Sequence, residues 1–255
     1  LWGLADVARA APNVFRGHAR ALTDAFGLAP RVARNHHLVW YGWDAAARDL
    51  AAAGVRMSFD YLAVDEPLGF EGGSGRPARF IAGGDQPLDI FQQPTQLDDF
   101  PLRSGETEAA KARLAARAQQ LLRAACAAGS PLTLNTHPAY YVTSPRWVDA
   151  LLARGVPAWD ADRWLAFSIA RRRSVLHARS GDPDGVTLDM EVASNASIAL
   201  PATWRGRVFT SASLDGKPVA AEAPSCGPAL PAPRGVRLIV VGKPGPRRLR
   251  ATYAR

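Results

Sequence analysis

At residues 32–43 the chain reads Val-Ala-Arg-Asn-His-His-Leu-Val-Trp-Tyr-Gly-Trp. Four consecutive polar side chains stand here between apolar residues. In an extended strand Arg34 and His36 would share one face, and Asn35 and His37 would share the other. The pattern therefore predicts a strand that brings one of these polar pairs to a pocket. The same two histidines also fit a plainer role, in which one is hydrogen-bonded in a core and the other is solvated.

The segments around this stretch follow one another in the order of a parallel α/β unit. A helix from Asn13 to Gly27 precedes the strand at 32–39, and a short helix at 45–53 leads to a second strand at 55–59. The alternation continues with a helix at 106–128, a strand at 132–136 and helices at 144–153 and 160–173. Short connections between such elements are typical of a parallel sheet covered by helices, so we predict an α/β domain over residues 1–173.

Between residues 62 and 105 the helical period disappears, and Gly, Pro, Asp and Gln become frequent. Apolar segments at 78–81 and 88–91 flank a Gly-Gly-Asp turn and predict a small hairpin. We interpret 62–105 as an insertion loop, because an insertion of this length usually builds a lid or a binding wall. Its polar end at 92–99 includes Gln93, which we assign to a hydroxyl-rich ligand, although a polar surface loop explains the same composition.

After Arg173 the pattern changes to short alternating segments separated by turn residues. These segments lie at 186–192, 207–210, 237–241 and 249–253. They predict a small antiparallel β-sandwich over residues 174–255. Because this part holds no clustered acidic residues and no His after His177, we assign it to packing or accessory binding rather than to chemistry.

Three strands of the predicted α/β domain end in polar residues. The first strand ends in Arg34, Asn35, His36 and His37, and Asp60 closes the second. Asn135 and His137 end a later one. Because the carboxyl ends of parallel strands lie on one side of a sheet or barrel, we predict that these side chains converge in one site. The candidate catalytic residues are His137, Asp60, Arg34 and His36. The candidate substrate-binding residues are Trp40, Tyr61, Asn135, Tyr140 and Gln93.

The composition excludes several classes of protein. With 47% hydrophobic and 21% charged residues, the 255-residue chain is typical of a globular protein able to bury a core. No apolar run approaches the roughly 20 residues that span a membrane. The net charge of +8 rests mainly on Arg residues scattered through an Ala-rich chain, so we predict no nucleic-acid partner. Cys126 and Cys226 form no metal motif, and their positions leave open whether they pair.

Three motifs carry a resemblance to a known family. They are Arg34-x-His36-x-x-x-Trp40 at one strand end, Asp60 at the next, and Leu-Thr-Leu-Asn-Thr-His137-Pro at a later one. Over residues 15–173 the chain resembles the second half of the polysaccharide deacetylase-like (carbohydrate esterase) barrel. It resembles most its bacterial relatives, in which a β-rich tail follows the barrel. The resemblance implies a partial or distorted (β/α) barrel followed by the β-sandwich, and a hydrolase that acts on a carbohydrate.

The resemblance also implies roles for three residues of this chain. Arg34 matches the Arg of the family's pocket, and Trp40 resembles its aromatic wall. His137 resembles the late His that protonates the leaving group or stabilises the oxyanion. The family's base is an Asp. These correspondences place the acid/base chemistry at the strand ends named above.

Metal binding is the feature in which the chain departs from the family. Members of the family hold a divalent metal, commonly zinc, through an Asp and two His on early strands. The Asp-Asp and His-x-x-x-His elements that supply these ligands have no counterpart in this sequence. Either a segment before Leu1 supplies them, or the metal chemistry is lost. Within this chain, zinc could be held only by one of His36 and His37 together with Asp60 and His137, and we assign no metal ligand.

Two classes of function follow. The first is a deacetylase-like hydrolase that cleaves an acyl amide, an ester or a glycosidic bond of a carbohydrate, with His137 as acid/base and Arg34 holding an anionic or carbonyl oxygen. The second is a non-catalytic carbohydrate-binding or structural module that keeps the pocket.

Overall fold

The structure is a computed structural model of the 255-residue chain and describes residues 4–35, 40–62, 74–98, 107–137, 152–153, 157–226 and 235–255. The chain divides into two compact units. The first comprises Leu1–Ala125 and Ser130–Ala153, and the second comprises Cys126–Gly129 and Arg154–Arg255. The division after Ala153 groups the last predicted helix of the α/β domain with the strands that follow it, whereas the sequence-based boundary falls after Arg173.

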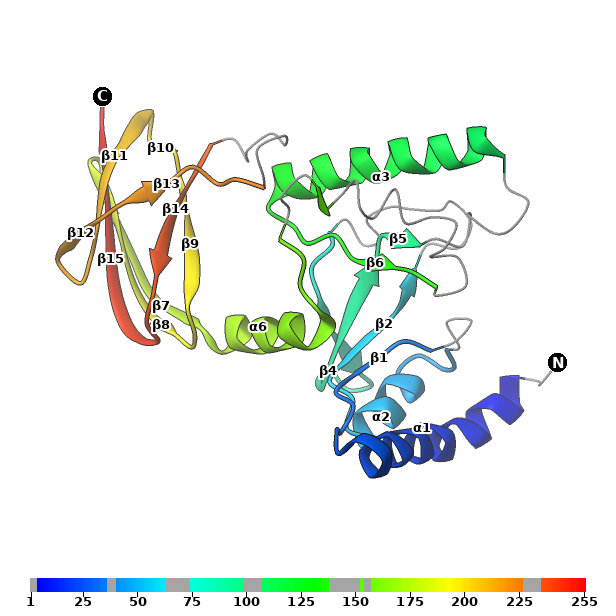
Figure 1. Cartoon of the computed structure of the whole chain (residues 1–255). Coiled ribbons are helices and arrows are strands. Elements are labelled where there is room, and N and C mark those ends of the chain that lie inside the picture. Colours follow the sequence, from blue (N-terminus) through cyan, green and yellow to red (C-terminus); the bar gives the residue numbers. More distant parts are fainter. Residues whose placement is uncertain are drawn as a thin grey trace. The chain divides into compact units, whose positions relative to one another are not determined.

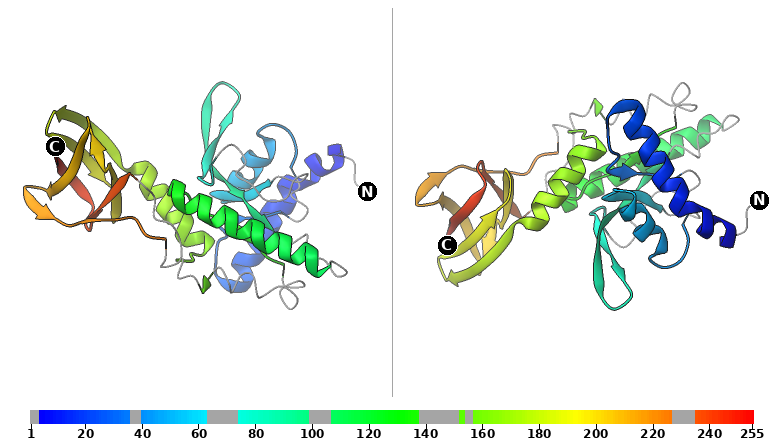
Figure 2. Two further views of the ribbon diagram at one scale, coloured as in Figure 1. Left: turned by 90° about the horizontal axis from the view of Figure 1, so that it is seen from above. Right: turned by 90° about the horizontal axis from the view of Figure 1, so that it is seen from below.

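The first unit is a layered arrangement of helices and strands (Figure 1). Its elements are α1 (Leu4–Phe26), β1 (Val32–Ala33), α2 (Ala45–Ala52), β2 (Met57–Leu62), β3 (Ala78–Ala82), β4 (Gln86–Thr95), β5 (Leu97–Asp98), α3 (Glu108–Ala128) and β6 (Leu134–Asn135). Figures 1 and 2 show α1 and α2 on one side of the strands and α3 on the other. Ala47 and Leu50 of α2 are buried with Val55 and Ile90, which forms the core between α2 and the sheet.

The strands of the first unit do not form the predicted barrel. Four of them make one sheet in the order β1-β2-β4-β3, in which β1, β2 and β4 are parallel and β3 is antiparallel to β4. β5 and β6 form a separate parallel pair. The predicted partial or distorted barrel is therefore wrong for the described strands, because none of their sheets closes. The physical reason is that β3 ends the sheet as an antiparallel edge strand, while β5 and β6 offer only two residues each for pairing.

Strand β4 changes the interpretation of residues 62–105. The predicted hairpin is present as β3 and β4, and Figure 2 shows it projecting from the first unit. β4 as a whole, however, is a strand of the sheet rather than part of a loop, since it pairs with β3 through residues 86–92 and with β2 through residues 91–95. Gln93 and Thr95 are buried there although they are polar. These polar side chains are buried because they form hydrogen bonds within the protein. The second half of β4 therefore lacks the run of apolar residues by which a buried strand is recognised in a sequence.

Helix α1 differs from the prediction at one end and agrees at the other. It ends at Phe26, and Gly27 follows with φ of +66°, the left-handed conformation that a residue without Cβ adopts easily. At the other end it begins at Leu4 and runs through Pro12, so the prediction of Asn13 as the helix start is wrong. Pro12 lies inside the helix, which accommodates it at the loss of one backbone hydrogen bond, so this proline does not mark the helix start. No helix in the described part of the chain is long and apolar enough to cross a membrane.

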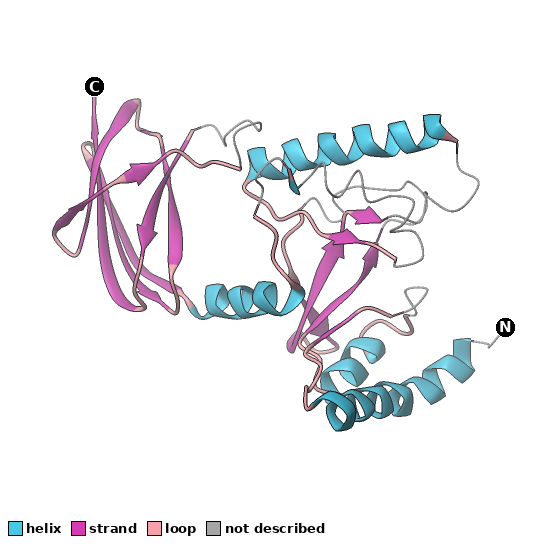
Figure 3. Cartoon of the chain, viewed as in Figure 1, coloured by secondary structure: helices cyan, strands magenta, loops and turns pink. Residues whose placement is uncertain are grey.

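The second unit starts with α6 (Ala161–Arg173) and continues as an all-β structure (Figure 3). Its strands are β7 (Val175–Asp182), β8 (Gly185–Val192), β9 (Ala196–Pro201), β10 (Thr203–Trp204), β11 (Arg207–Leu214), β12 (Lys217–Val219), β13 (Ala221–Glu222), β14 (Val236–Val241) and β15 (Gly245–Ala254). One sheet has the order β10-β11-β15-β8-β7 with β12 beside β11, and the other has the order β13-β14-β9. All pairs are antiparallel, and Leu249, Ile239 and Tyr253 lie in their common core. The four segments that alternate in the sequence lie within β8, β11, β14 and β15.

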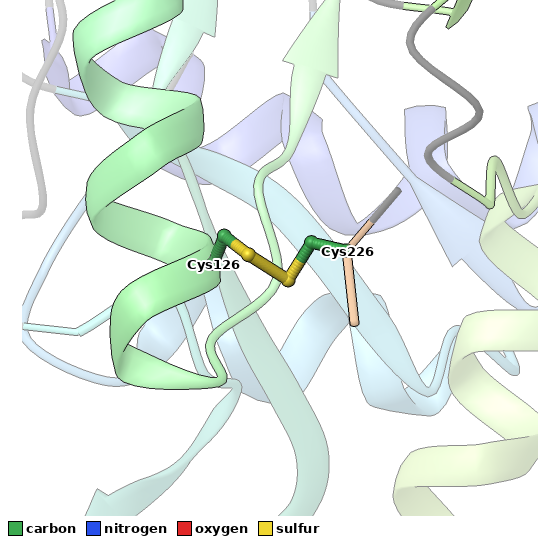
Figure 4. The surroundings of a disulfide bond; sticks show 2 residues. All are labelled: Cys126 and Cys226. Carbon is green, nitrogen blue, oxygen red and sulfur yellow. A yellow bond between two sulfur atoms is a disulfide. The ribbon is translucent and has the colours of Figure 1, made fainter. Parts of the chain in front are cut away.

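A disulfide joins two parts of the second unit that are far apart in the sequence. Cys126 in the last turn of α3 is bonded to Cys226, which follows β13, with the two Cα atoms 5.8 Å apart (Figure 4). The bond closes a loop with a sequence separation of 100 residues. The sequence left this pairing open, and the structure contains no free cysteine among its described residues.

Candidate functional site

Arg34 is bonded to residues of three strands at once. It follows β1, and its Nη1 donates to the carbonyl oxygen of Phe59 in β2 at 2.9 Å and to Oγ1 of Thr95 in β4 at 2.8 Å. Its Nη2 lies 3.0 Å from Oδ2 of Asp98 in β5. Thr95 also donates its hydroxyl to the same Phe59 carbonyl at 3.1 Å. The planar guanidinium suits this task, since it presents several donors in fixed directions.

Asp98 extends this cluster to β6. The register of the short parallel pair sets Asp98 beside Asn135, whose Nδ2 donates to Oδ2 of Asp98 at 2.8 Å. The Asp98 side chain is 7% exposed and the Arg34 side chain 22% exposed. A carboxylate this deeply buried is stable only with a charged or hydrogen-bonding partner, and here it has both.

Asp60 forms a second cluster next to Arg34. Its Oδ1 accepts from the backbone N–H of Asn35 at 2.6 Å, and its Oδ2 accepts from Nδ2 of Asn35 and from Oγ of Ser58, each at 2.8 Å. The register between β2 and β4 shifts between Ser58 and Tyr61. A bulge of this kind changes the direction of nearby side chains, and bulges often lie beside functional sites.

Burial raises the pKa of the Asp60 carboxyl above that of an exposed aspartate. Hydrogen bonds from Asn35 and Ser58 and the charge of Arg34 act in the opposite direction, because they favour the carboxylate. Burial has the larger effect, and the residue is only 7% exposed. A carboxyl group in this state is a candidate for proton transfer.

Gln93 serves a structural purpose in this conformation. Its side chain is fully buried, and its Nε2 donates to the carbonyl oxygens of Gly75 and Pro94 and to Oγ1 of Thr133. The neighbouring Gln96 accepts from the backbone N–H of Thr133 at 2.7 Å. Gln93 is therefore not placed to contact a substrate, contrary to the prediction, because its amide is buried and hydrogen-bonded between β4 and the segment before β6.

Two of the three predicted aromatic residues, Trp40 and Tyr61, lie in the described part of the chain and differ in their surroundings. Trp40 stacks on Phe80 with ring centroids 5.0 Å apart and packs against the core formed with α2. Tyr61 in β2 is 41% exposed and is free to face a ligand. Trp43, which was not predicted as a site residue, is 81% exposed and donates its indole N–H to the carbonyl oxygen of Ile81. Trp40 thus contributes to packing, whereas Tyr61 stays a candidate for substrate contact.

His137 follows β6 and is partly buried. It lies two residues after Asn135, the residue that donates to Asp98. His36, His37 and Tyr140 lie outside the described residues. Among the residues that the structure describes, no group of three or more His, Cys, Asp or Glu side chains is placed to hold a metal ion.

Three members of these clusters were not predicted from the sequence: Asp98, Thr95 and Ser58. Asp98 and Thr95 belong to the polar stretch that was interpreted as a loop, so their position at strand ends was missed. Ser58 stands two residues before Asp60, and this spacing in a strand puts both side chains on one face. This two-residue spacing could have indicated Ser58 from the sequence. No local sequence pattern, in contrast, distinguishes Asp98 from the adjacent Asp99.

Together the two clusters are a buried, hydrogen-bonded polar region that draws on five strands: it lies at the ends of β1, β4, β5 and β6 and inside β2. They contain an ion pair, a carboxyl group with a raised pKa and two carboxamides. Such a set can transfer a proton and can hold strand ends in fixed positions. No family model, curated protein or solved structure matches the chain.

Proposed function

We propose that the chain carries the pocket of a polysaccharide deacetylase-like hydrolase that cleaves an acyl amide or ester bond of a carbohydrate. The environment of Asp60 is the observation that most supports this function. Asp60 has a buried carboxyl group with a raised pKa, held by Asn35 and Ser58 beside Arg34. Groups with perturbed pKa values concentrate at active sites, where they take or give protons near neutral pH.

The proposed reaction has one base and one acid. Asp60 takes a proton from water, and the water oxygen forms a bond to the acyl carbon. The bond from that carbon to the sugar's nitrogen or oxygen then breaks, and His137 gives a proton to the leaving amine or alcohol. Tyr61 borders the substrate. The resembling family also uses a divalent metal, whereas the described residues of this chain form no group of ligands for one.

Arg34 acts in this scheme as a positioning residue. Its guanidinium is bonded to Phe59, Thr95 and Asp98, so it fixes the segments that carry Asp60 and Asn135. We had predicted that Arg34 holds a substrate oxygen directly. Because its guanidinium is bonded to protein groups, we instead propose that Arg34 acts indirectly, by positioning other residues. A positioning role requires that Arg34→Lys lower kcat while leaving the pH profile of the reaction in place.

The test is an assay of the protein encoded by the full gene on acetylated oligosaccharides, with release of acetate as the readout. We expect Asp60→Asn and His137→Ala to lower kcat by about 10²-fold or more, the usual contribution of a general acid or base. Asp89→Asn is the matched control, because Asp89 is 78% exposed on β4 and pairs with Arg56. Activity of Asp60→Asn equal to that of the control would reject the role of Asp60.

A non-catalytic carbohydrate-binding or structural module is the second candidate. One observation favours it: Asp60 and Asp98 are both buried and both accept hydrogen bonds from protein donors. A module of this kind would bind the same oligosaccharides without releasing acetate. Calorimetric binding by the wild-type protein, together with no turnover, would decide for this candidate.

A further inference from the structure

The excess positive charge of the chain belongs to one part of it. Residues 154–255 contain 16 Lys and Arg but 8 Asp and Glu, whereas residues 1–153 contain 15 of each kind. The segment Cys126–Gly129, which completes the second unit, contains no charged residue. The net charge of +8 is therefore a property of the second unit, and a domain so charged attracts polyanions.

Part of this charge gathers around Trp204, at the end of β10. Cζ of Arg179 in β7 lies 4.8 Å from the centroid of the Trp204 ring, and Cζ of Arg205 lies 5.6 Å from it. The indole N–H donates to the carbonyl oxygen of Asp182 at 3.2 Å, which fixes the ring against β7. We call Arg179, Trp204 and Arg205 the Trp204 cluster. It joins β7 and β10, which are the two outer strands of the sheet order.

The nearby carboxylates are already paired. Asp182 is bonded to Arg250 at 3.2 Å, and Asp184 is bonded to Arg207. Among the described residues, no ion pair involves Arg179 or Arg205. The two guanidinium groups of the Trp204 cluster are solvent-exposed, and within the described part of the chain no carboxylate pairs with either of them.

The backbone at Arg205 adds a separate observation. Arg205 has φ of +49° and Gly206 has φ of +76°, and these two residues connect β10 to β11. Two-residue hairpin turns with positive φ at both positions favour Asn, Asp or Gly at the first position. An Arg there is held in a conformation that its side chain disfavours, and such strain is commonly kept where the side chain has a function.

We propose that the Trp204 cluster binds an anionic polysaccharide, with Arg179 and Arg205 holding its carboxylate, sulfate or phosphate groups. A carbohydrate is favoured over nucleic acid because the same unit contains a disulfide, and disulfides persist mainly outside the reducing cytosol. It is favoured over an anionic lipid surface because Trp204 is held by its N–H bond and covered by guanidinium groups. The ring is thus not free to insert among lipid chains, as interfacial aromatic residues do. The inference uses only residues of the second unit and does not depend on the proposed hydrolase.

The experiment compares two polymers and two double variants of the oxidised, full chain. Dextran sulfate is the anionic probe, and dextran of the same length is the neutral one. Arg179→Gln with Arg205→Asn removes both charges of the cluster, and Asn suits the turn at position 205. Arg171→Gln with Arg172→Gln removes the same charge from the exposed end of α6 and serves as the matched control.

We expect dextran sulfate to bind the wild-type chain and dextran not to bind. The cluster variant should bind dextran sulfate about tenfold more weakly or worse, the loss expected for charged hydrogen bonds, while the control loses less than about threefold. The single variant Arg205→Asn should show an unchanged or raised Tm, which separates loss of binding from loss of folding. Equal losses in the two double variants would overturn the proposal. Binding of duplex DNA or of phosphatidylglycerol vesicles as tight as that of dextran sulfate would overturn it as well.

Discussion

The guanidinium of Arg34 lies 3.0 Å from the carboxylate of Asp98, a residue 64 positions further along the chain. The pair stands where β1 and β5 end, and Asn135 of β6 donates to the same oxygen of Asp98. Since Arg34 also reaches Phe59 and Thr95, one side chain connects β1, β2, β4 and β5. The candidate site is thus assembled by a long-range ion pair rather than by one local motif.

Removal of Arg34 is expected to destabilise the first unit strongly. Arg34→Met leaves the Asp98 carboxylate buried without its charged partner, and a loss of about 3–5 kcal/mol in the free energy of unfolding follows from breaking such a pair. Urea denaturation followed by circular dichroism measures this loss. Arg56→Met is the matched control, because Arg56 and Asp89 form an exposed pair worth about 1 kcal/mol or less. Equal losses in the two variants would show that the Arg34 pair is not buried as described.

The stability contributed by Asp60 is expected to fall as pH rises. Because its pKa is higher in the folded chain than in the unfolded chain, the folded state binds more protons at pH values between the two. The free energy of unfolding therefore decreases as pH rises from the unfolded pKa through the folded pKa. Asp60→Asn removes this effect. Urea denaturation of both proteins from acidic to neutral pH should show that the wild type loses stability relative to the variant, and parallel curves would contradict the raised pKa.

Loss of the disulfide is expected to destabilise the second unit. Cys126→Ser with Cys226→Ser opens a loop of 100 residues, and removal of a native disulfide typically costs about 2–5 kcal/mol. Thermal denaturation with and without dithiothreitol measures the effect. The wild type should lose stability in the reductant, whereas the double variant should not respond to it. Titration of two free thiols in the oxidised wild type would refute the pairing.

Gly185 is expected to tolerate no side chain. A Cβ at this position would lie 2.7 Å from the backbone carbonyl oxygen of Ala251, so β8 and β15 would have to separate locally. We expect Gly185→Ala to lower the free energy of unfolding by about 1–3 kcal/mol, as overpacking does. Gly83→Ala is the control, since nothing lies within 4 Å of its added Cβ and its φ is not positive. The control should change stability by less than about 1 kcal/mol. A loss in the control as large as in Gly185→Ala would contradict the close approach of the two strands.

Local patterns predicted most of the elements. The alternating segments after Arg173 lie in strands, and Gly27 follows the end of α1, because these features depend on neighbouring residues alone. The sequence also predicted that Asn35 and Asp60 stand at strand ends; Asn35 does follow β1, whereas Asp60 lies inside β2, two residues before its end. Their hydrogen bond, in contrast, depends on the parallel pairing of β1 and β2, which no local pattern contains.

The sequence by itself determined where helices, strands and turns alternate and which polar residues stand near strand ends, because periodicity, Gly and Pro act over a few residues. Only the tertiary structure decided that β4 is a central strand, that the sheet stays open, and that Cys126 pairs with Cys226. It also decided that Arg34 pairs with Asp98. The pairing of β2 with β4, the Arg34–Asp98 ion pair and the disulfide join residues 33 to 100 positions apart, whose partners are selected by packing and burial of the whole chain and not by neighbouring residues.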